Sequence, residues 1–136
     1  MDRTVLTKEH NPKVITKVLV VDDEPLIADT IVAILQRSGF KATAAYNGTE
    51  AVEVAGEYCP DCMITDVLMP GMTGIETAKI VQQICPEARI LLFSGQAATA
   101  DLLAEARSEG LDFDLLPKPV HPLTLIKKLR DSEDEC

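Results

Sequence analysis

The sequence has no tryptophan and few other aromatic residues, with two tyrosines and three phenylalanines in 136 residues. It also has no long apolar run, because stretches such as 18–21 and 31–35 soon meet polar residues. A membrane-spanning helix needs about 20 consecutive apolar residues, and a signal peptide needs an apolar core near its N-terminus. The sequence offers neither, so we expect a cytoplasmic protein with no membrane partner.

Basic residues are scarce, since 13 lysines and arginines stand against 22 aspartates and glutamates, for a net charge of −9. Nucleic acid is therefore not expected as a partner, because a phosphate backbone attracts a basic surface. An acidic chain suits a cationic ligand such as a metal ion, or a basic protein surface. The length and the 46% of hydrophobic residues fit one globular domain.

The four cysteines are Cys59, Cys62, Cys85 and Cys136. Without an export signal we expect them to be free thiols. Cys59 and Cys62 form a C-x-x-C pair, but a redox pair of this kind opens a helix, whereas this one leads into a strand-like run. A turn followed by a buried strand thiol is favoured over a redox or metal role.

Strand-like apolar runs alternate five times with helical patterns in which apolar residues recur every three or four positions. The runs that predict strands cover 17–21, 41–46, 61–65, 89–93 and 112–116. The patterns that predict helices cover 25–38, 49–55, 75–84, 97–109 and 122–130. Such alternation predicts an α/β fold, with a doubly wound five-stranded parallel sheet and five helices. Five units make an open sheet, because a closed barrel needs eight.

The pattern also predicts the limits of the domain. Residues 1–16 have mixed charge and no periodicity, so we expect an N-terminal tail. The domain is expected to cover 17–131, followed by a short acidic C-terminal end at 132–136. Few residues follow the last helix, so we expect a single-domain protein that acts through protein contacts.

Polar side chains stand where the predicted strands end. Asp22 and Asp23 follow the first strand, Asp66 the third, Ser94 the fourth and Lys118 the fifth. Open parallel sheets bind ligands at the carboxyl ends of their strands, so these side chains should share one cleft. Taken one at a time, these residues have ordinary structural explanations. The acidic pair could simply stabilise a helix N-terminus, and the lysine could be a solvated surface residue. Their coincidence on four strand ends favours a site.

Three carboxylates in one cleft repel one another, and a divalent cation removes that conflict. Mg²⁺ prefers hard oxygen ligands and shares its coordination shell with phosphate. Lys118 is a compact positive charge for an anionic group, and Ser94 can donate a hydrogen bond to the same group. An acidic nucleophile, a metal, a lysine and a hydroxyl are the parts that phosphoryl transfer to a carboxylate requires.

The motifs that carry these residues resemble the receiver domains of bacterial two-component response regulators. The motifs are VLVVDDEP at 18–25, DVLMPGMTG at 66–74, LFSG at 92–95 and KP at 118–119. The resemblance covers about residues 17–130, nearly the whole chain. It implies a flavodoxin-like sheet with strand order 2-1-3-4-5 and a cis peptide bond between Lys118 and Pro119.

The resemblance also implies a role for each residue. Asp66 would be the phosphoacceptor, taking a phosphoryl group from a sensor histidine kinase or a histidine phosphotransfer protein. Asp23, the Asp66 carboxylate and the backbone carbonyl of Leu68 would bind Mg²⁺, with Asp22 acting largely through a water. Lys118 would pair with the phosphoryl oxygens, and Ser94 would move to meet them. The protein would then be a phosphoacceptor regulator, not an enzyme, whose only reactions are self-phosphorylation from a donor and slow self-dephosphorylation.

Two features depart from the family pattern, at Leu115 and in the segment 110–118. Leu115 stands three residues before the lysine, where an aromatic residue is usual, so aromatic switching is not expected; Phe113 is expected to pack in the core instead. The segment 110–118 is one residue longer than usual. The positions that tune dephosphorylation hold Leu68 and Gln96, and because Leu68 cannot orient water, slow hydrolysis of the acyl phosphate is expected.

By the resemblance, the surface that reports to a downstream protein would comprise 97–109, the fifth strand and 122–130. Two other functions are weighed against the phosphoacceptor. A degenerate receiver that only binds partners would not need the complete set of acids, serine and lysine. A phosphatase of the haloacid dehalogenase type would place two acids two positions apart in its first strand, whereas Asp22 and Asp23 are adjacent.

Overall fold

The computed structural model describes residues 15–95, 99–110 and 113–134. Its five strands are β1 (Lys17–Val21), β2 (Lys41–Ala45), β3 (Cys62–Asp66), β4 (Arg89–Ser94) and β5 (Asp114–Pro117). Its five helices are α2 (Pro25–Arg37), α3 (Gly48–Glu57), α4 (Gly74–Ile84), α5 (Thr99–Ser108) and α6 (Pro122–Asp134). The expected alternation of strands and helices is confirmed.

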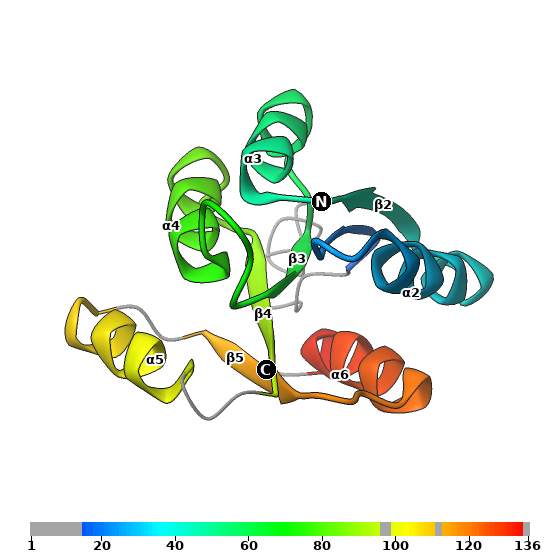
Figure 1. Ribbon diagram of the computed structural model, residues 1–136. Helices are drawn as coiled ribbons and strands as arrows, with labels where there is room; N and C mark the ends of the chain where they lie inside the picture. Colours follow the sequence, from blue (N-terminus) through cyan, green and yellow to red (C-terminus); the bar gives the residue numbers. More distant parts are fainter. Residues whose placement is uncertain (1–14, 96–98, 111–112, 135–136) are drawn as a thin grey trace, which may run out of the picture.

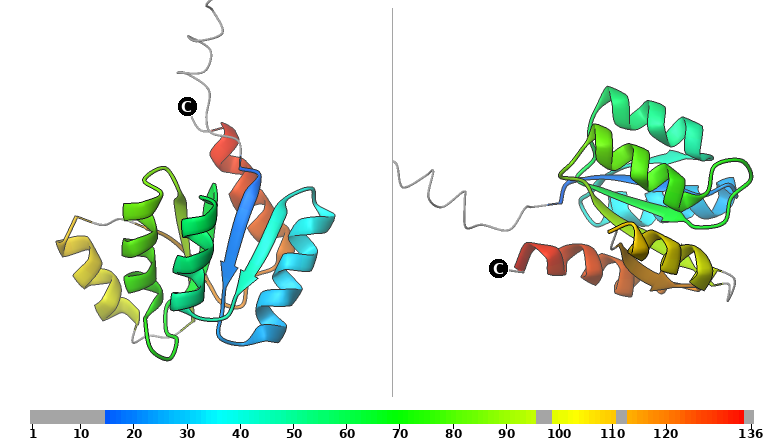
Figure 2. Two further views of the ribbon diagram at one scale, coloured as in Figure 1. Left: turned by 90° about the horizontal axis from the view of Figure 1, so that it is seen from above. Right: turned by 90° about the vertical axis from the view of Figure 1, so that its left-hand side faces the viewer.

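The strands form one parallel sheet in the order β2-β1-β3-β4-β5, which confirms the predicted topology. Helices α3, α4 and α5 cover one face of the sheet, and α2 and α6 cover the other (Figure 1). All strands point the same way, so the loops after them gather at one edge, while the start of β1 and the end of α6 lie at the opposite edge (Figure 2). The carboxyl edge of the sheet is therefore formed by the loops that follow the strands.

The central strands are buried on both faces. Leu19 and Val21 of β1 pack into the cluster beneath α3 and α4, whereas Val18 and Val20 pack into the cluster beneath α2 and α6. This division follows from strand geometry, because successive side chains point to opposite faces. Within the described parts of the chain, no helix is both long and apolar enough to cross a membrane.

Some element boundaries differ from the expected ones. Helix α6 continues to Asp134, beyond the expected end at residue 130, because no glycine or proline interrupts the acidic residues that follow. Gly56 lies inside α3 instead of ending it. Ile15 is buried in the core beneath α2 and α6, so the chain already packs before the predicted domain start at Lys17. The domain limits 17–131 otherwise remain a prediction, since most of the tail lies outside the described residues.

The prediction that the cysteines are free thiols is wrong for two of them. Cys59 and Cys85 form a disulfide that joins the ends of α3 and α4 across a sequence separation of 26. The two helices pack side by side, which brings the residues after them together (Figure 1). The buried strand position expected for Cys62 is confirmed. Cys136 lies outside the described residues.

Candidate functional site

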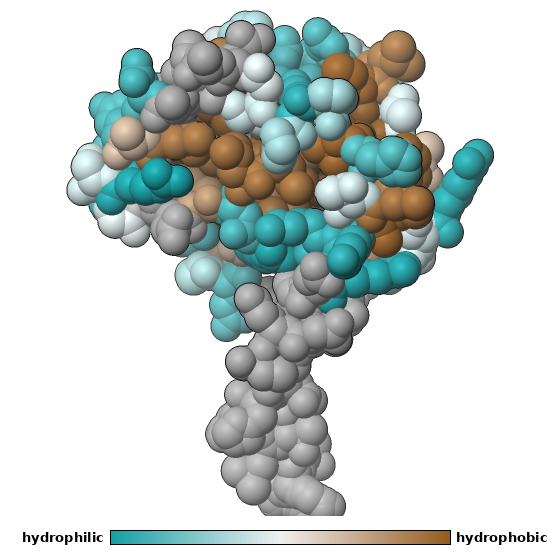
Figure 3. All heavy atoms as spheres, turned by 90° about the horizontal axis from the view of Figure 1, so that it is seen from below, coloured by the Kyte–Doolittle hydropathy of each residue, from teal (hydrophilic) through white to brown (hydrophobic). Residues whose placement is uncertain are grey.

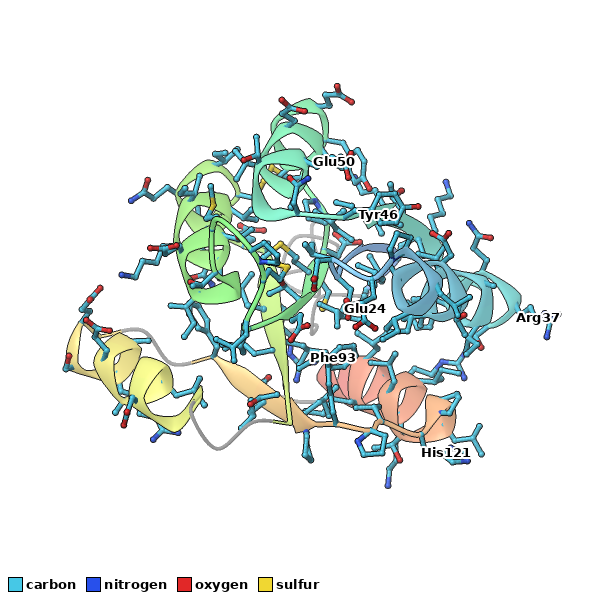
Figure 4. All side chains as sticks on the ribbon, viewed as in Figure 1. Glu24, Arg37, Tyr46, Glu50, Phe93 and His121 are labelled. Carbon is cyan, nitrogen blue, oxygen red and sulfur yellow. A yellow bond between two sulfur atoms is a disulfide. The ribbon has the colours of Figure 1, made fainter. Side chains whose placement is uncertain are left out.

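The carboxyl edge of the sheet brings together polar residues from four strands. Asp22 directly follows β1, and its backbone N–H still donates to the Ala45 carbonyl, so the sheet pairing holds it in place. Asp66 is the last residue of β3 and Ser94 the last of β4. Figure 4 looks onto this edge, with Glu24 and Phe93 near its centre. These residues therefore lie where a parallel sheet binds its ligands, at the carboxyl ends of the strands.

Three carboxylates converge at this edge. Asp22, Asp23 and Asp66 each offer an oxygen, and these oxygens all lie within 4.8 Å of one another. Asp22 is buried, whereas Asp23 and Asp66 are partly exposed and open to solvent. Such a set of hard oxygen donors fits a divalent cation of the Mg²⁺ class.

Asp22 is the most constrained of the three acids. One carboxylate oxygen, Oδ1, accepts a hydrogen bond of 2.9 Å from the Glu24 backbone N–H. The other, Oδ2, is buried and accepts no hydrogen bond from any described residue. Burial raises the pKa of Asp22 above its ordinary value, and the nearby negative charges of Asp66 and Asp23 raise it further. A buried oxygen without a donor is what a cation ligand needs, so Asp22 fits a metal site.

We predict that Asp22→Asn stabilises the protein when divalent cations are removed. The folded protein holds the Asp22 proton more tightly than the unfolded chain does, so this group destabilises the fold as pH rises through its raised pKa. Near neutral pH the amide removes a buried charge, and we expect the free energy of unfolding to rise. Urea unfolding in a chelator measures this. The exposed Asp101→Asn is the control, and a fall in stability for Asp22→Asn would contradict the prediction.

Lys118 supplies the positive charge of the site. Its Nζ lies 3.1 Å from Asp66 Oδ2 and 3.8 Å from Asp22 Oδ2. Its backbone N–H donates to the Ser94 carbonyl, and the peptide bond to Pro119 is cis, as the resemblance implied. A methyl group on Gly95 would lie 3.1 Å from Lys118 Cβ, so glycine permits the close approach of these two segments.

The loop between β3 and α4 positions Asp66. The Gly74 N–H donates to the Val67 carbonyl at 2.8 Å and closes the loop. Thr73 then caps α4 by a reciprocal pair of hydrogen bonds with Glu76. Leu68 is 40% exposed, on the outside of this loop. These contacts fix the start of α4 at Gly74, at the end of the loop that follows Asp66.

One residue beside the site was missed from the sequence. Tyr46 directly follows β2, so the same strand-end rule would have found it. Its hydroxyl donates to Asp29, and its backbone N–H donates to the Glu50 side chain. Tyr46 and Glu50 are labelled in Figure 4. Tyr46, Glu50 and Asp23 line an open depression of about 650 Å³ beside the carboxylates. Gln96, named above as a tuning position, lies outside the described residues.

The arrangement has the parts for chemistry on an anionic phosphoryl group. Asp66 is a partly exposed carboxylate that can act as a nucleophile. Lys118 lies beside it and can neutralise charge on a transferred group. The three acids can hold a cation that does the same.

The sequence is similar to a known protein family and to several known proteins. Residues 18–130 match the family described as the response regulator receiver domain. The chain is 32% identical to the chemotaxis protein CheY of Thermotoga maritima, covering 83% of this chain and 93% of that protein. It is 30% identical to the DNA-binding response regulator MtrA of Mycolicibacterium smegmatis, covering 88% of this chain but 53% of that protein.

Length distinguishes these relatives. The chain spans about half of MtrA and of the transcriptional regulatory protein TcrX of Mycobacterium tuberculosis, with 53% and 46% of their lengths covered. Among solved structures, CheY4 of Vibrio cholerae is 32% identical with a TM-score of 0.76, covering 87% of this chain and 98% of that one. A response regulator receiver domain protein from Clostridium thermocellum is 29% identical with a TM-score of 0.78, covering 88% and 94%.

Proposed function

This chain belongs to the response regulator receiver domain family of two-component signalling, and we propose that it is a working phosphoacceptor whose acceptor is Asp66. The observation that carries the proposal is the ion pair of 3.1 Å between Asp66 and Lys118 beside two further carboxylates. A degenerate receiver that only binds partners would have no need to keep this set of groups together.

The proposed reaction transfers a phosphoryl group from a phosphohistidine to Asp66. An Asp66 carboxylate oxygen attacks phosphorus, the P–N bond breaks, and the imidazole leaves with that electron pair. The product is an acyl phosphate. Lys118 would move from the carboxylate to an oxygen of the phosphoryl group, and the Ser94 hydroxyl would donate to another.

The proposed ligands of Mg²⁺ are the carboxylates of Asp22, Asp23 and Asp66 and the backbone carbonyl of Leu68. When bound, the cation would neutralise negative charge on the phosphoryl oxygens. The support for this set is the convergence of the three acids and the buried Asp22 oxygen without a donor. The donor of the phosphoryl group is proposed to be a sensor histidine kinase or a histidine phosphotransfer protein.

Intact mass after incubation with acetyl phosphate and Mg²⁺ tests the proposal. We expect a gain of one phosphoryl group, about 80 Da, that disappears in excess chelator and on treatment with hydroxylamine, which cleaves acyl phosphates. A control receiver runs in parallel. No gain where the control reacts would overturn the proposal and favour the degenerate receiver.

Leu68 predicts a long-lived acyl phosphate. Its apolar side chain is 40% exposed at the loop after Asp66 and has no group that can orient an attacking water. We expect the phosphoryl group to persist for minutes or longer, and Leu68→Asn to shorten its lifetime. The measurement is decay of the mass gain after removal of acetyl phosphate. A half-life of seconds in the unaltered protein would refute this prediction.

The proposed output is contact with a downstream protein through α5, β5 and α6. This side of the molecule gathers hydrophobic side chains over β5 and toward α6 (Figure 3). Leu115 is 42% exposed and Leu123 is 70% exposed, whereas Phe113 packs against the core beneath α3, α4 and α5. Switching by an inward-turning aromatic at position 115 is therefore not proposed.

A further inference from the structure

The disulfide between Cys59 and Cys85 takes no part in the chemistry above. Cys59 lies between the end of α3 and the start of β3, and Cys85 caps the C-terminus of α4. Both belong to the amino edge of the sheet, and Asp66 ends β3 at the carboxyl edge. The feature is thus separate from the acidic site and needs its own explanation.

The two cysteine residues differ in exposure. Cys59 is exposed, whereas Cys85 is only 3% exposed. The Cys85 sulfur lies 3.6 Å from the Ala55 carbonyl oxygen, beneath the last turn of α3. Exchange of a disulfide begins when a thiolate attacks one sulfur and the other sulfur leaves. The exposure of the two residues therefore favours attack at Cys59 over attack at Cys85.

We propose that Cys59 is a thiol–disulfide exchange site for low-molecular-weight thiols, with Cys85 as its resolving partner. The attacking thiolate forms an S–S bond to Cys59, the Cys59–Cys85 bond breaks, and Cys85 leaves as a thiolate. A second thiolate attacks the sulfur of the adduct and releases Cys59. Two external thiols are oxidised to one disulfide, and the protein disulfide is reduced to two thiols that take up two protons. The reverse sequence closes the bond again.

Cys62 does not compete for this exchange, although it forms the C-x-x-C pair with Cys59. It is fully buried in β3 and packs with Val18 and Val20 in the core beneath α2 and α6. Cys85 packs in the other core, beneath α3 and α4. The sheet therefore lies between Cys62 and the disulfide, and the exchange is confined to Cys59 and Cys85.

The disulfide links the two ends of the chain segment that contains the proposed acceptor, Asp66. β3, Asp66, the loop after it and α4 all lie between Cys59 and Cys85 in sequence. The oxidised form ties both ends of this segment together, and the reduced form releases them. The exchange chemistry itself does not depend on whether Asp66 accepts a phosphoryl group.

The test is reaction of the oxidised full-length chain with reduced glutathione, quenched with acid and followed by intact mass and peptide mapping. We expect a transient adduct of one glutathione on Cys59 with a thiol at Cys85, and then two thiols. Mapping separates any adduct on Cys136. The matched control Cys62→Ala should react in the same way. A bond that opens only in denaturant, or an adduct on Cys85, would overturn the proposal.

Single cysteine variants sharpen the test. In Cys85→Ser the exposed Cys59 should take up glutathione from its disulfide at least about tenfold faster than Cys85 does in Cys59→Ser, because burial limits access. Equal rates would contradict the assigned roles. If Cys85→Ser does not fold, the mapped position of the adduct in the unaltered chain decides between the two sulfurs.

Discussion

Replacing Asp66 by Asn is expected to abolish the phosphoryl mass gain of about 80 Da while the protein stays folded. The amide has the shape of the carboxylate but lacks the anionic oxygen that the proposed reaction requires for attack on phosphorus. It also removes the partner of Lys118 at 3.1 Å and one of the three converging acids. We expect the rate of phosphoryl uptake to fall by more than about 100-fold. The measurement is intact mass with acetyl phosphate and Mg²⁺.

The control for this variant is Asp101→Asn, which alters an exposed acid in the first turn of α5. It changes the net charge by the same amount and should leave the mass gain intact. Urea unfolding of the Asp66→Asn protein should show no loss of stability in chelator, since the variant relieves repulsion on Asp22. An acyl phosphate that still forms in Asp66→Asn would place the acceptor on another carboxylate.

Gly74→Ala is expected to lower the free energy of unfolding by about 2–4 kcal/mol, although alanine is the better helix former. Gly74 begins α4, and a methyl group there would collide with the Asp66 backbone carbonyl and lie 3.0 Å from Val67 Cα. Neither of these backbone atoms can rotate away, so the loop itself must shift. Because Asp66 directly precedes that loop, the rate of phosphoryl uptake should fall as well.

Gly56→Ala is the matched control. Gly56 lies within α3, and a methyl group added there would meet no atom within 4 Å. Its backbone is helical, so the substitution should raise the free energy of unfolding by about 0.5–1 kcal/mol. Urea unfolding of both variants separates the effect of the collision from the general effect of alanine. Equal stability of Gly74→Ala and the unaltered protein would show that the loop tolerates the methyl group.

The positions of the site residues were predictable because they depend on local pattern. Each strand is a short apolar run, and a polar residue at its end must lie at the carboxyl edge of a parallel sheet. Asp22, Asp66, Ser94 and Lys118 all follow this rule. Tyr46 follows it too, since it stands directly after β2.

The disulfide was not predictable in this way. Cys59 and Cys85 are brought together by the packing of α3 on α4, which no spacing in the sequence reveals. The C-x-x-C spacing drew attention to Cys62 instead, and the strand directs that residue to the opposite core. The expectation of free thiols rested on an argument about cellular compartment, which carries no information about this packing.

The site takes its side chains from strands at both ends of the chain, since Asp22 follows β1 and Lys118 follows β5. Separating either β1 or β5 from the sheet therefore dismantles the site, and a ligand held there opposes unfolding of the domain. A ligand at 100 times its dissociation constant adds about 2.7 kcal/mol to the free energy of unfolding. A protease that cleaves only the unfolded chain would then meet about 100-fold fewer cleavable molecules. A bound ligand would therefore lengthen the lifetime of the protein in the presence of such a protease.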